Sequence, residues 1–308
     1  MATFNDMIDE VSINLSGYTL QQDRSTYLKN AITTTTSSSA SPLVAYLGST
    51  DSVGKGIIEI DEELLWVDSY DRISNTATIA PYGRGYLGTT AATHTADTKV
   101  TISPTFPRFS IKRAINDTIN AIGASIFSAN TTTITSNSAV AAFRLPTTGA
   151  TLNIRSVLSA SYQSIGASKE WLPIRSYRFD GNANADAFTS GQTLSIYDNI
   201  PSGRTIQVVY SADPAPFTSN SQVFTEQTGL PESCRDVIVL GATYRLLSNL
   251  DPARAAMVSP QADETDSKRP YGSSQSTTKQ VYALFSQRLN EEISNQQSKY
   301  PIRIHYSL

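Results

Sequence analysis

Apolar residues recur at helical spacing in four separate stretches of the chain. After Pro107, a residue suited to a first helical turn, five isoleucines fall on one helix face: Ile111, Ile115, Ile119, Ile122 and Ile126. The same period predicts helices over residues 3–15, from Pro231 to near residue 249, and from about 277 to 298. None of these helices can bury its apolar stripe alone, so we expect the four to pack together.

Two stretches between the expected helices have the pattern of β-strands instead. Residues 27–102 are rich in β-branched and aromatic residues separated by turn signals, which predicts a small module of about five strands. Within it, Asp61, Glu62 and Glu63 are expected in a solvated hairpin turn that joins strands 56–60 and 64–70. Residues 141–210 contain further short strands broken by proline and glycine, which indicates a compact, sandwich-like module.

These patterns together predict an α+β fold with a four-helix core, two inserted β modules and an extended C-terminal arm. The expected segments are an N-terminal core helix (1–25), the first β module (26–103), the central core helix (104–128), the second β module (129–228), the C-terminal core helices with a polar linker (229–298) and the arm (299–308). After Pro301, apolar residues of the arm alternate with polar ones. Such an arm can add to the sheet of a neighbour or fold back on its own chain, and the pattern leaves both open.

Composition narrows the class of protein. Of the 308 residues, 39% are hydrophobic and 17% are charged, a balance that with many Ser and Thr is typical of β-rich globular proteins. The net charge of -3 argues against a broad basic surface that grips nucleic acid. Cys234, the single cysteine, excludes an internal disulfide and is expected to be a packing residue. The N-terminus lacks the pattern of a signal peptide and no segment approaches about 20 apolar residues, so we expect synthesis in the cytoplasm and no membrane partner.

The chain offers little material for catalysis. Gly83, Gly85 and Gly88 satisfy the G-x-G-x-x-G pattern, which holds a dinucleotide pyrophosphate when it leads from a strand directly into a helix. Here the expected helix begins about twenty residues later, so we interpret these glycines as residues of tight turns. His94 and His305 are the two imidazoles, and neither has metal-ligand spacing or a nucleophile elbow with it. We therefore expect no catalytic residue, cofactor or metal, and a structural or binding protein rather than an enzyme.

Two weaker chemical interpretations stay open at this point. Glu59 and the acidic residues of the expected hairpin turn could collect a calcium ion, although the chain has no EF-hand loop. Four aromatic residues could line a sugar cleft, although most are expected in the cores of the β modules: Trp66, Trp171, Tyr177 and Tyr197.

Several segments, taken together, resemble head-to-tail adaptor (connector) proteins of tailed bacteriophages. Residues 56–119 contain an E-x-x-W/Y-V strand pair, then a GRGY-x-GTTAA-x-H turn, then a P-x-FPR-x-x-x-KRAIN helix. The C-terminal part is similar to the same family in KEWLPIRSYRFD, SGRTIQVVYSA and TGLPESCRDVIVLGATYRLLSNLDPAR. The resemblance covers most of the chain, and under it the expected four-helix core is adaptor-like.

The resemblance implies a structural protein of the virion neck, at the head–tail junction, made in the host cytoplasm. Its copies would form a homo-oligomeric ring, usually of twelve, that joins the portal protein to stopper or tail proteins. Genomic DNA would pass through the lumen during ejection without sequence-specific binding. The alternatives are a phage tail or fibre protein, a carbohydrate-binding module, or a hexameric stopper or tail-completion protein.

Two groups of residues are predicted to make the contacts of such an adaptor. The first is an arm that docks on the portal: Pro301, Ile302, Arg303, Ile304, His305, Tyr306 and Leu308. The second is a turn that contacts another subunit or the neck: Gly83, Arg84, Gly85, Tyr86, Gly88 and His94.

Overall fold

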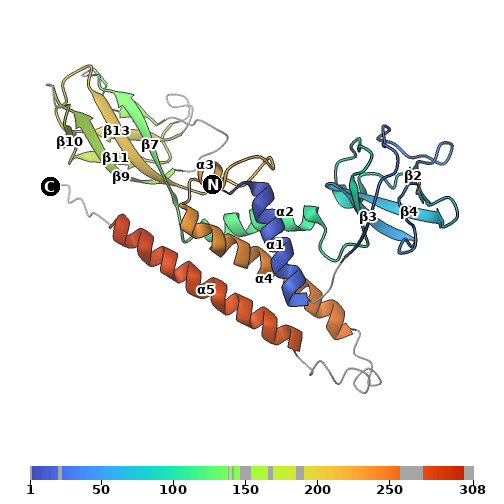
Figure 1. Ribbon diagram of the computed structural model, residues 1–308. Coiled ribbons are helices and arrows are strands. Elements are labelled where there is room, and N and C mark those ends of the chain that lie inside the picture. The colour runs from blue at the N-terminus through green and yellow to red at the C-terminus, as the bar shows by residue number, and fades with distance from the viewer. Residues whose placement is uncertain are drawn as a thin grey trace. The chain divides into compact units, whose positions relative to one another are not determined.

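The computed structural model describes residues 2–19, 23–137, 139–140, 142–145, 154–165, 169–184, 191–256 and 273–301 (Figure 1). The chain divides into two compact units, each built from separate segments. Unit 1 comprises Met1–Met7, Asn116–Gly241 and Gln280–Leu308, and unit 2 comprises Ile8–Ile115 and Ala242–Lys279. Each unit therefore contains a β region and parts of the helices that join it to the rest of the chain.

Unit 2 contains one six-stranded antiparallel sheet in the order β1-β6-β3-β4-β5-β2. Its strands are β1 (Arg24–Tyr27), β2 (Val44–Tyr46), β3 (Gly56–Ile60), β4 (Glu63–Asp71), β5 (Thr76–Ile79) and β6 (Lys99–Ile102). The two edge strands meet through an antiparallel bridge between Leu28 and Leu47, and the amide of Gly48 donates to the carbonyl of Tyr27. The two ends of the sheet thus meet at this point, and the sheet curves into a small barrel.

The interior of this barrel is filled by aliphatic side chains. They are Leu28, Ile32, Ala45, Leu47, Val53, Ile58, Ile60, Leu65, Val67, Ala77, Ile79, Val100 and Ile102, all of them buried. Gly48 lies at the seam, where a Cβ would come within 2.3 Å of the Tyr27 ring, so a larger residue here would require that ring to move. The predicted hairpin is confirmed: Gly56–Ile60 pairs with the first residues of β4.

The first two helices each begin at a hydrogen-bonded cap. α1 (Phe4–Thr19) starts in unit 1 and continues in unit 2; at its start, the amide and hydroxyl of Thr3 both donate to Asp6 at 2.8 Å, and the Asp6 amide donates back to the Thr3 hydroxyl. α2 (Arg108–Ile122) begins after Pro107, as expected, and its first backbone amide donates to the Glu59 carboxylate at 2.6 Å. The five isoleucines of the predicted stripe are buried, which confirms its helical face, although Ile126 lies beyond the end of the helix.

Unit 1 contains two antiparallel sheets with a shared core. A four-stranded sheet has the order β10-β9-β13-β7 and a three-stranded sheet has the order β11-β12-β8. Their strands are β7 (Ser128–Thr135), β8 (Ala142–Arg144), β9 (Ile154–Gln163), β10 (Trp171–Pro173), β11 (Tyr177–Asp180), β12 (Thr193–Ile196) and β13 (Thr205–Ala212). One cluster of buried residues draws on both sheets, with Leu194 from β12 and Ile206 and Val208 from β13 among its most buried members.

The helices of unit 1 bind its sheets through specific contacts. They comprise the start of α1, the end of α2, α3 (Phe224–Thr228), the start of α4 (Arg235–Ala256) and most of α5 (Ser273–Lys299). The ring of Phe4 stacks on that of Phe217, 4.3 Å between centroids, in the segment that follows β13. In the last turn of α5, the side chain of Gln296 donates to the carbonyl of Phe127 at 2.6 Å and accepts from its amide at 3.1 Å.

The predicted fold class is wrong. The described residues form a mostly β structure of three sheets with five α-helices, and not a four-helix core with two inserted β modules. The two large apolar clusters described above lie in the sheets. An apolar stripe shows which face of a helix is buried but not what covers it, and Phe4 and Gln296 both contact segments that flank strands. The extended arm of that prediction, after Pro301, lies outside the described residues.

Candidate functional site

A glycine-rich turn between β5 and β6 is the most unusual piece of backbone in unit 2. It contains a short 3-10 segment, Tyr86–Gly88, and several residues in the left-handed region. Tyr82 and Leu87 have φ angles of 59° and 55°, although neither is glycine. Gly85 has φ 59°, and a Cβ there would lie 2.7 Å from the Thr89 carbonyl oxygen, so this position requires glycine. Such strain persists only where the surrounding structure holds the backbone firmly.

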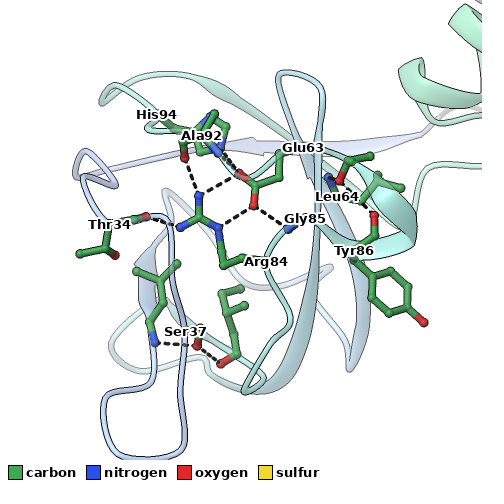
Figure 2. Close-up of polar contacts among 12 residues, drawn as sticks. Thr34, Ser37, Glu63, Leu64, Arg84, Gly85, Tyr86, Ala92 and His94 are labelled. Atoms are coloured by element: carbon green, nitrogen blue, oxygen red, sulfur yellow. Dashed lines mark hydrogen bonds and ion pairs between the residues drawn. The ribbon is translucent and has the colours of Figure 1, made fainter.

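The turn is held by one buried carboxylate, that of Glu63 at the start of β4 (Figure 2). Its Oε1 accepts from Arg84 Nε at 2.6 Å and from the Gly85 amide at 3.0 Å. Its Oε2 accepts from Arg84 Nη2 at 2.8 Å, the Ala92 amide at 2.9 Å and His94 Nε2 at 2.9 Å. Five donors on four lone-pair positions saturate this carboxylate, so a hairpin residue fixes both ends of the turn at once.

Electrostatics at Glu63 favour the ionised form. Burial would raise the pKa of Glu63, but the hydrogen bonds from Arg84, His94 and the amides of Ala92 and Gly85 outweigh it and lower the pKa to about 2. The Glu63 and Arg84 side chains are 1% and 3% exposed, which makes this a buried, bidentate ion pair. Removing either partner would leave the other charge buried without compensation.

The guanidinium of Arg84 connects three segments of the chain. Besides the two bonds to Glu63, it donates to the backbone carbonyls of Thr34 and Ala92. Figure 2 shows the guanidinium between the Glu63 carboxylate on one side and these carbonyls on the other. Because a guanidinium only donates, these acceptors account for most of its hydrogen-bonding capacity. Arg84 is therefore an internal clamp of the barrel.

His94 lies between two carboxylates. Its Nδ1 is 2.9 Å from Asp61 Oδ2 and its Nε2 is 2.9 Å from Glu63 Oε2. Burial lowers the pKa of His94, but the hydrogen bonds to Glu63 and Asp61 outweigh it and raise the pKa above 6.5. Ionised carboxylates only accept, so the imidazolium is the form of the ring that can donate to both of them at once. Backbone bonds to Ile32 fix the residue further.

A second buried carboxylate lies four residues before Glu63. Glu59 is 5% exposed and accepts the first amide of α2, that of Arg108. Burial raises the pKa of Glu59 to about 7, against the lowering effect of the Arg108 hydrogen bond. Glu59 and Glu63 thus belong to one hairpin, but their pKa values are shifted in opposite directions, because only Glu63 is paired with the guanidinium of Arg84.

The cluster positions a turn and offers no reaction centre. Its carboxylate is saturated, its histidine is held between two acids, and no nucleophile is paired with either. In the described parts of the chain, no group of three or more His, Cys, Asp or Glu side chains is placed to hold a metal ion. What the turn presents outward is apolar: Tyr82 is 88% exposed and Leu87 is 62% exposed. A rigid turn with exposed apolar tips is suited to protein contact.

The residues of the predicted contact turn differ in how deeply they are buried. Gly83, Arg84 and His94 are buried, Gly85 and Tyr86 are half-buried, and Gly88 is exposed. The Tyr86 ring contacts Trp66 at 5.1 Å between centroids. The role of this turn in subunit or neck contact stays a prediction, and Tyr82 and Leu87, which the sequence argument did not select, are its most exposed large side chains.

The sequence argument also missed Glu63, which it placed in a solvated turn. A usable signal was present, because Glu63 is the glutamate of the E-x-x-W/Y-V pattern, and Arg84 and His94 are fixed positions of the GRGY-x-GTTAA-x-H pattern. A charged residue fixed within an otherwise apolar strand pattern indicates a buried pair. Of the predicted portal-docking arm, only Pro301 lies in the described residues, so that assignment also stays a prediction.

Two comparisons with known proteins, and a search for membrane-spanning helices, bear on identity. No helix among the described residues is both long and apolar enough to cross a membrane. The comparison with curated proteins gave no match. A family model described as SU10 adaptor protein matches residues 87–303, which is well over half of the chain and includes His94, both sheets of unit 1 and α5. The resemblance to phage head-to-tail adaptors is therefore confirmed, and the chain belongs to the SU10 adaptor protein family.

Proposed function

We propose that the protein forms a ring in the virion neck that joins the portal to the tail and lets DNA pass through its lumen. The family establishes the coarser part of this statement: the chain is a phage structural adaptor, of a non-enzymatic kind, that acts with other head or tail proteins of the virion. The ring, its twelve copies and the portal as neighbour are the proposal.

The family match over residues 87–303 carries this proposal, and two further observations support it. The net charge of -3 is compatible with DNA that slides past, since binding to phosphates depends on many cationic contacts. A ring closes through a heterologous interface, in which one surface of each copy contacts a different surface of the next. The rigid turn with Tyr82 and Leu87 at its tips is our candidate for one of these surfaces.

The test is electron microscopy of the protein purified alone and together with its portal, followed by labelling of the virion neck. We expect a ring of twelve copies, seated on the portal in the co-purified sample. Trimeric rods or binding to a glycan array would instead indicate a tail fibre or carbohydrate-binding role. A ring of six that does not bind the portal directly would indicate a stopper.

A double variant, Tyr82→Ser with Leu87→Ser, tests the turn within the same experiment. Both side chains are exposed, so the fold should persist while ring formation or neck attachment weakens at least ten-fold. Ile73→Ser is the matched control, because Ile73 is 95% exposed in the β4–β5 turn of the same barrel. Equal effects of the two changes would show that the glycine-rich turn has no special role.

A further inference from the structure

Strand β7 of unit 1 has an open edge. It pairs with β13 along all eight of its residues, from Ser128 to Thr135, and no other described strand pairs with it. Its sequence, SANTTTIT, contains neither a charged residue nor a proline. Thr131, Thr133 and Thr135 are exposed along it. A long, uncharged edge of this kind presents a row of backbone groups to any strand that approaches.

The other described edges of unit 1 are guarded. β10 has three residues and ends at Pro173, and β8 also has three residues. β11 has four residues and carries Arg178 and Asp180. Short strands, proline and charge are the usual means by which proteins protect sheet edges against unwanted pairing. The lack of all three on β7 points to an edge that is covered by a partner strand in the assembled protein.

We propose that this edge receives the C-terminal arm, residues 302–308, of a second copy of the chain. The arm has seven residues and β7 has eight, so their lengths match. Ile302, Ile304, Tyr306 and Leu308 would form one face of the added strand. On β7, the half-buried side chains of Thr132 and Ile134 form the corresponding face, and Ile134 packs on the core of the sheets. Backbone bonds would provide affinity and the alternating side chains the register.

The position of the helix that leads into the arm favours a second copy over the same chain. Gln296 of α5 is bonded to both the amide and the carbonyl of Phe127, and the Tyr300 ring is 5.9 Å from that of Phe127. The arm of each copy thus begins at the N-terminal end of its own β7. From there it could run along β7 only in the parallel direction.

Every strand pair of unit 1 is antiparallel, and the parallel arrangement is the less stable. Antiparallel pairing requires the arm to enter at the Thr135 end of β7. Eight residues at about 3.3 Å each place that end roughly 26 Å away, which is the full reach of seven extended residues. A chain's own arm would use all seven of its residues to reach the Thr135 end and would have none left to pair with β7. The arm of a neighbouring copy can enter from that end.

This inference rests on the proposed ring, because the ring brings copies together, and it gives the arm a destination inside the ring in place of the portal. The test is disulfide trapping between two differently tagged chains made in one cell. One chain carries His305→Cys, which would lie on the face of the added strand opposite its apolar side chains, and the other carries Thr131→Cys, Thr133→Cys or Thr135→Cys on the matching exposed face of β7. Cys234 does not compete, since it is 2% exposed and burial raises the pKa of its thiol to about 12.

We expect mild oxidation to give a cross-linked dimer that carries both tags with at least one of the three β7 positions. Ser25→Cys, exposed on β1 of unit 2, is the matched control and should give none. Truncation after Pro301 should abolish the cross-link and weaken ring assembly at least ten-fold by light scattering, with an unchanged circular dichroism spectrum.

Three results would overturn the inference. The first is a cross-link within one chain and not between chains when Thr133→Cys and His305→Cys are combined. The second is a cross-link from position 305 to the portal alone. The third is the absence of any cross-link in rings that form and bind the portal, and in this case the proposed function stands without the inference. A dual-tagged dimer in a protein that fails to bind the portal would leave the inference standing and contradict the function.

Discussion

The β regions of the two units differ at the edges of their sheets. In unit 2 the sheet closes through Leu28 and Leu47, with Gly48 allowing the close approach at the seam. In unit 1 the four-stranded sheet ends at β7, whose outer side pairs with no described strand. A closed sheet satisfies its own backbone groups, whereas an open one leaves them for water or a partner. The edges of the unit 2 sheet already meet within the unit, while under the proposal above the open edge of unit 1 is covered on assembly.

The buried ion pairs of the two regions also differ, because the pair in the barrel is more completely enclosed. Glu63 and Arg84 are almost fully enclosed in the barrel. In unit 1, Glu292 of α5 is also buried, at 5%, and accepts from Ser233 and Arg288. The Arg288 side chain is 31% exposed, however, so water can compensate part of its charge. Enclosure decides how much each cluster contributes to stability.

The largest expected effect is therefore from Glu63→Gln. The change leaves the Arg84 and His94 charges in the barrel without their carboxylate, which should lower the free energy of unfolding by about 3–5 kcal/mol. Denaturant titration measures it. Glu292→Gln, the counterpart in unit 1, should cost about 1–3 kcal/mol. Asp68→Asn, which removes the exposed ion pair with Lys55, is the control and should cost less than about 1 kcal/mol. Equal costs for the two glutamates would break the comparison.

Acid should destabilise the barrel by protonating Glu63. The pKa of Glu63 is lowered from 4.5 to about 2, so its contribution is complete above pH 4.5 and is lost as the pH falls towards 2. The chain has two tryptophans, so Trp171→Phe makes fluorescence report on Trp66 of the barrel, and Trp66→Phe makes it report on unit 1. We expect the Trp66 signal to show loss of stability over this range in urea. A Glu63→Gln background should remove most of that dependence.

Glu59 should give an effect of opposite sign and smaller size. Its pKa is raised to about 7, so the stability it contributes is present below pH 4.5 and is lost as the pH rises through 7. Glu59→Gln keeps an acceptor for the Arg108 amide without the charge. At pH 8 this variant should be more stable than the unchanged protein by on the order of 1–3 kcal/mol. Urea titrations at pH 5 and pH 8 measure the difference, and a variant that is less stable at pH 8 would contradict it.

The smallest difference between the two regions is expected at two glycines, one in each. Gly85→Ala combines a φ of 59° with a clash against the Thr89 carbonyl, so it should cost about 2–3 kcal/mol. Gly203→Ala, in the turn before β13, has φ 80° but open space around the Cβ, so it should cost about 1 kcal/mol. Thermal unfolding of the two variants compares them. A larger cost at Gly203 would mean that the barrel turn is less tightly held than its hydrogen bonds indicate.

The sequence by itself determined the local elements. Period 3.6 identified the buried face of α1, where Phe4, Met7, Ile8, Val11 and Leu15 are all buried, and that of α2. Turn signals located the hairpin of β3 and β4. These features follow from neighbouring residues, whose contacts lie within a few positions along the chain. The adaptor motifs were equally local, which is why the family could be recognised from them.

Only the tertiary structure decided the fold class and the role of the charged residues. Closure of the barrel joins Leu28 to Leu47, and Glu63 contacts Arg84 and His94 from 21 and 31 residues away. Such pairings depend on which segments meet in space, and a pattern of apolar positions does not specify its partner. The same reason explains why the helices were wrongly assigned to a core of their own. It also explains why Glu63, which the sequence placed in a solvated turn, is the buried centre of the hydrogen bonds that hold the glycine-rich turn.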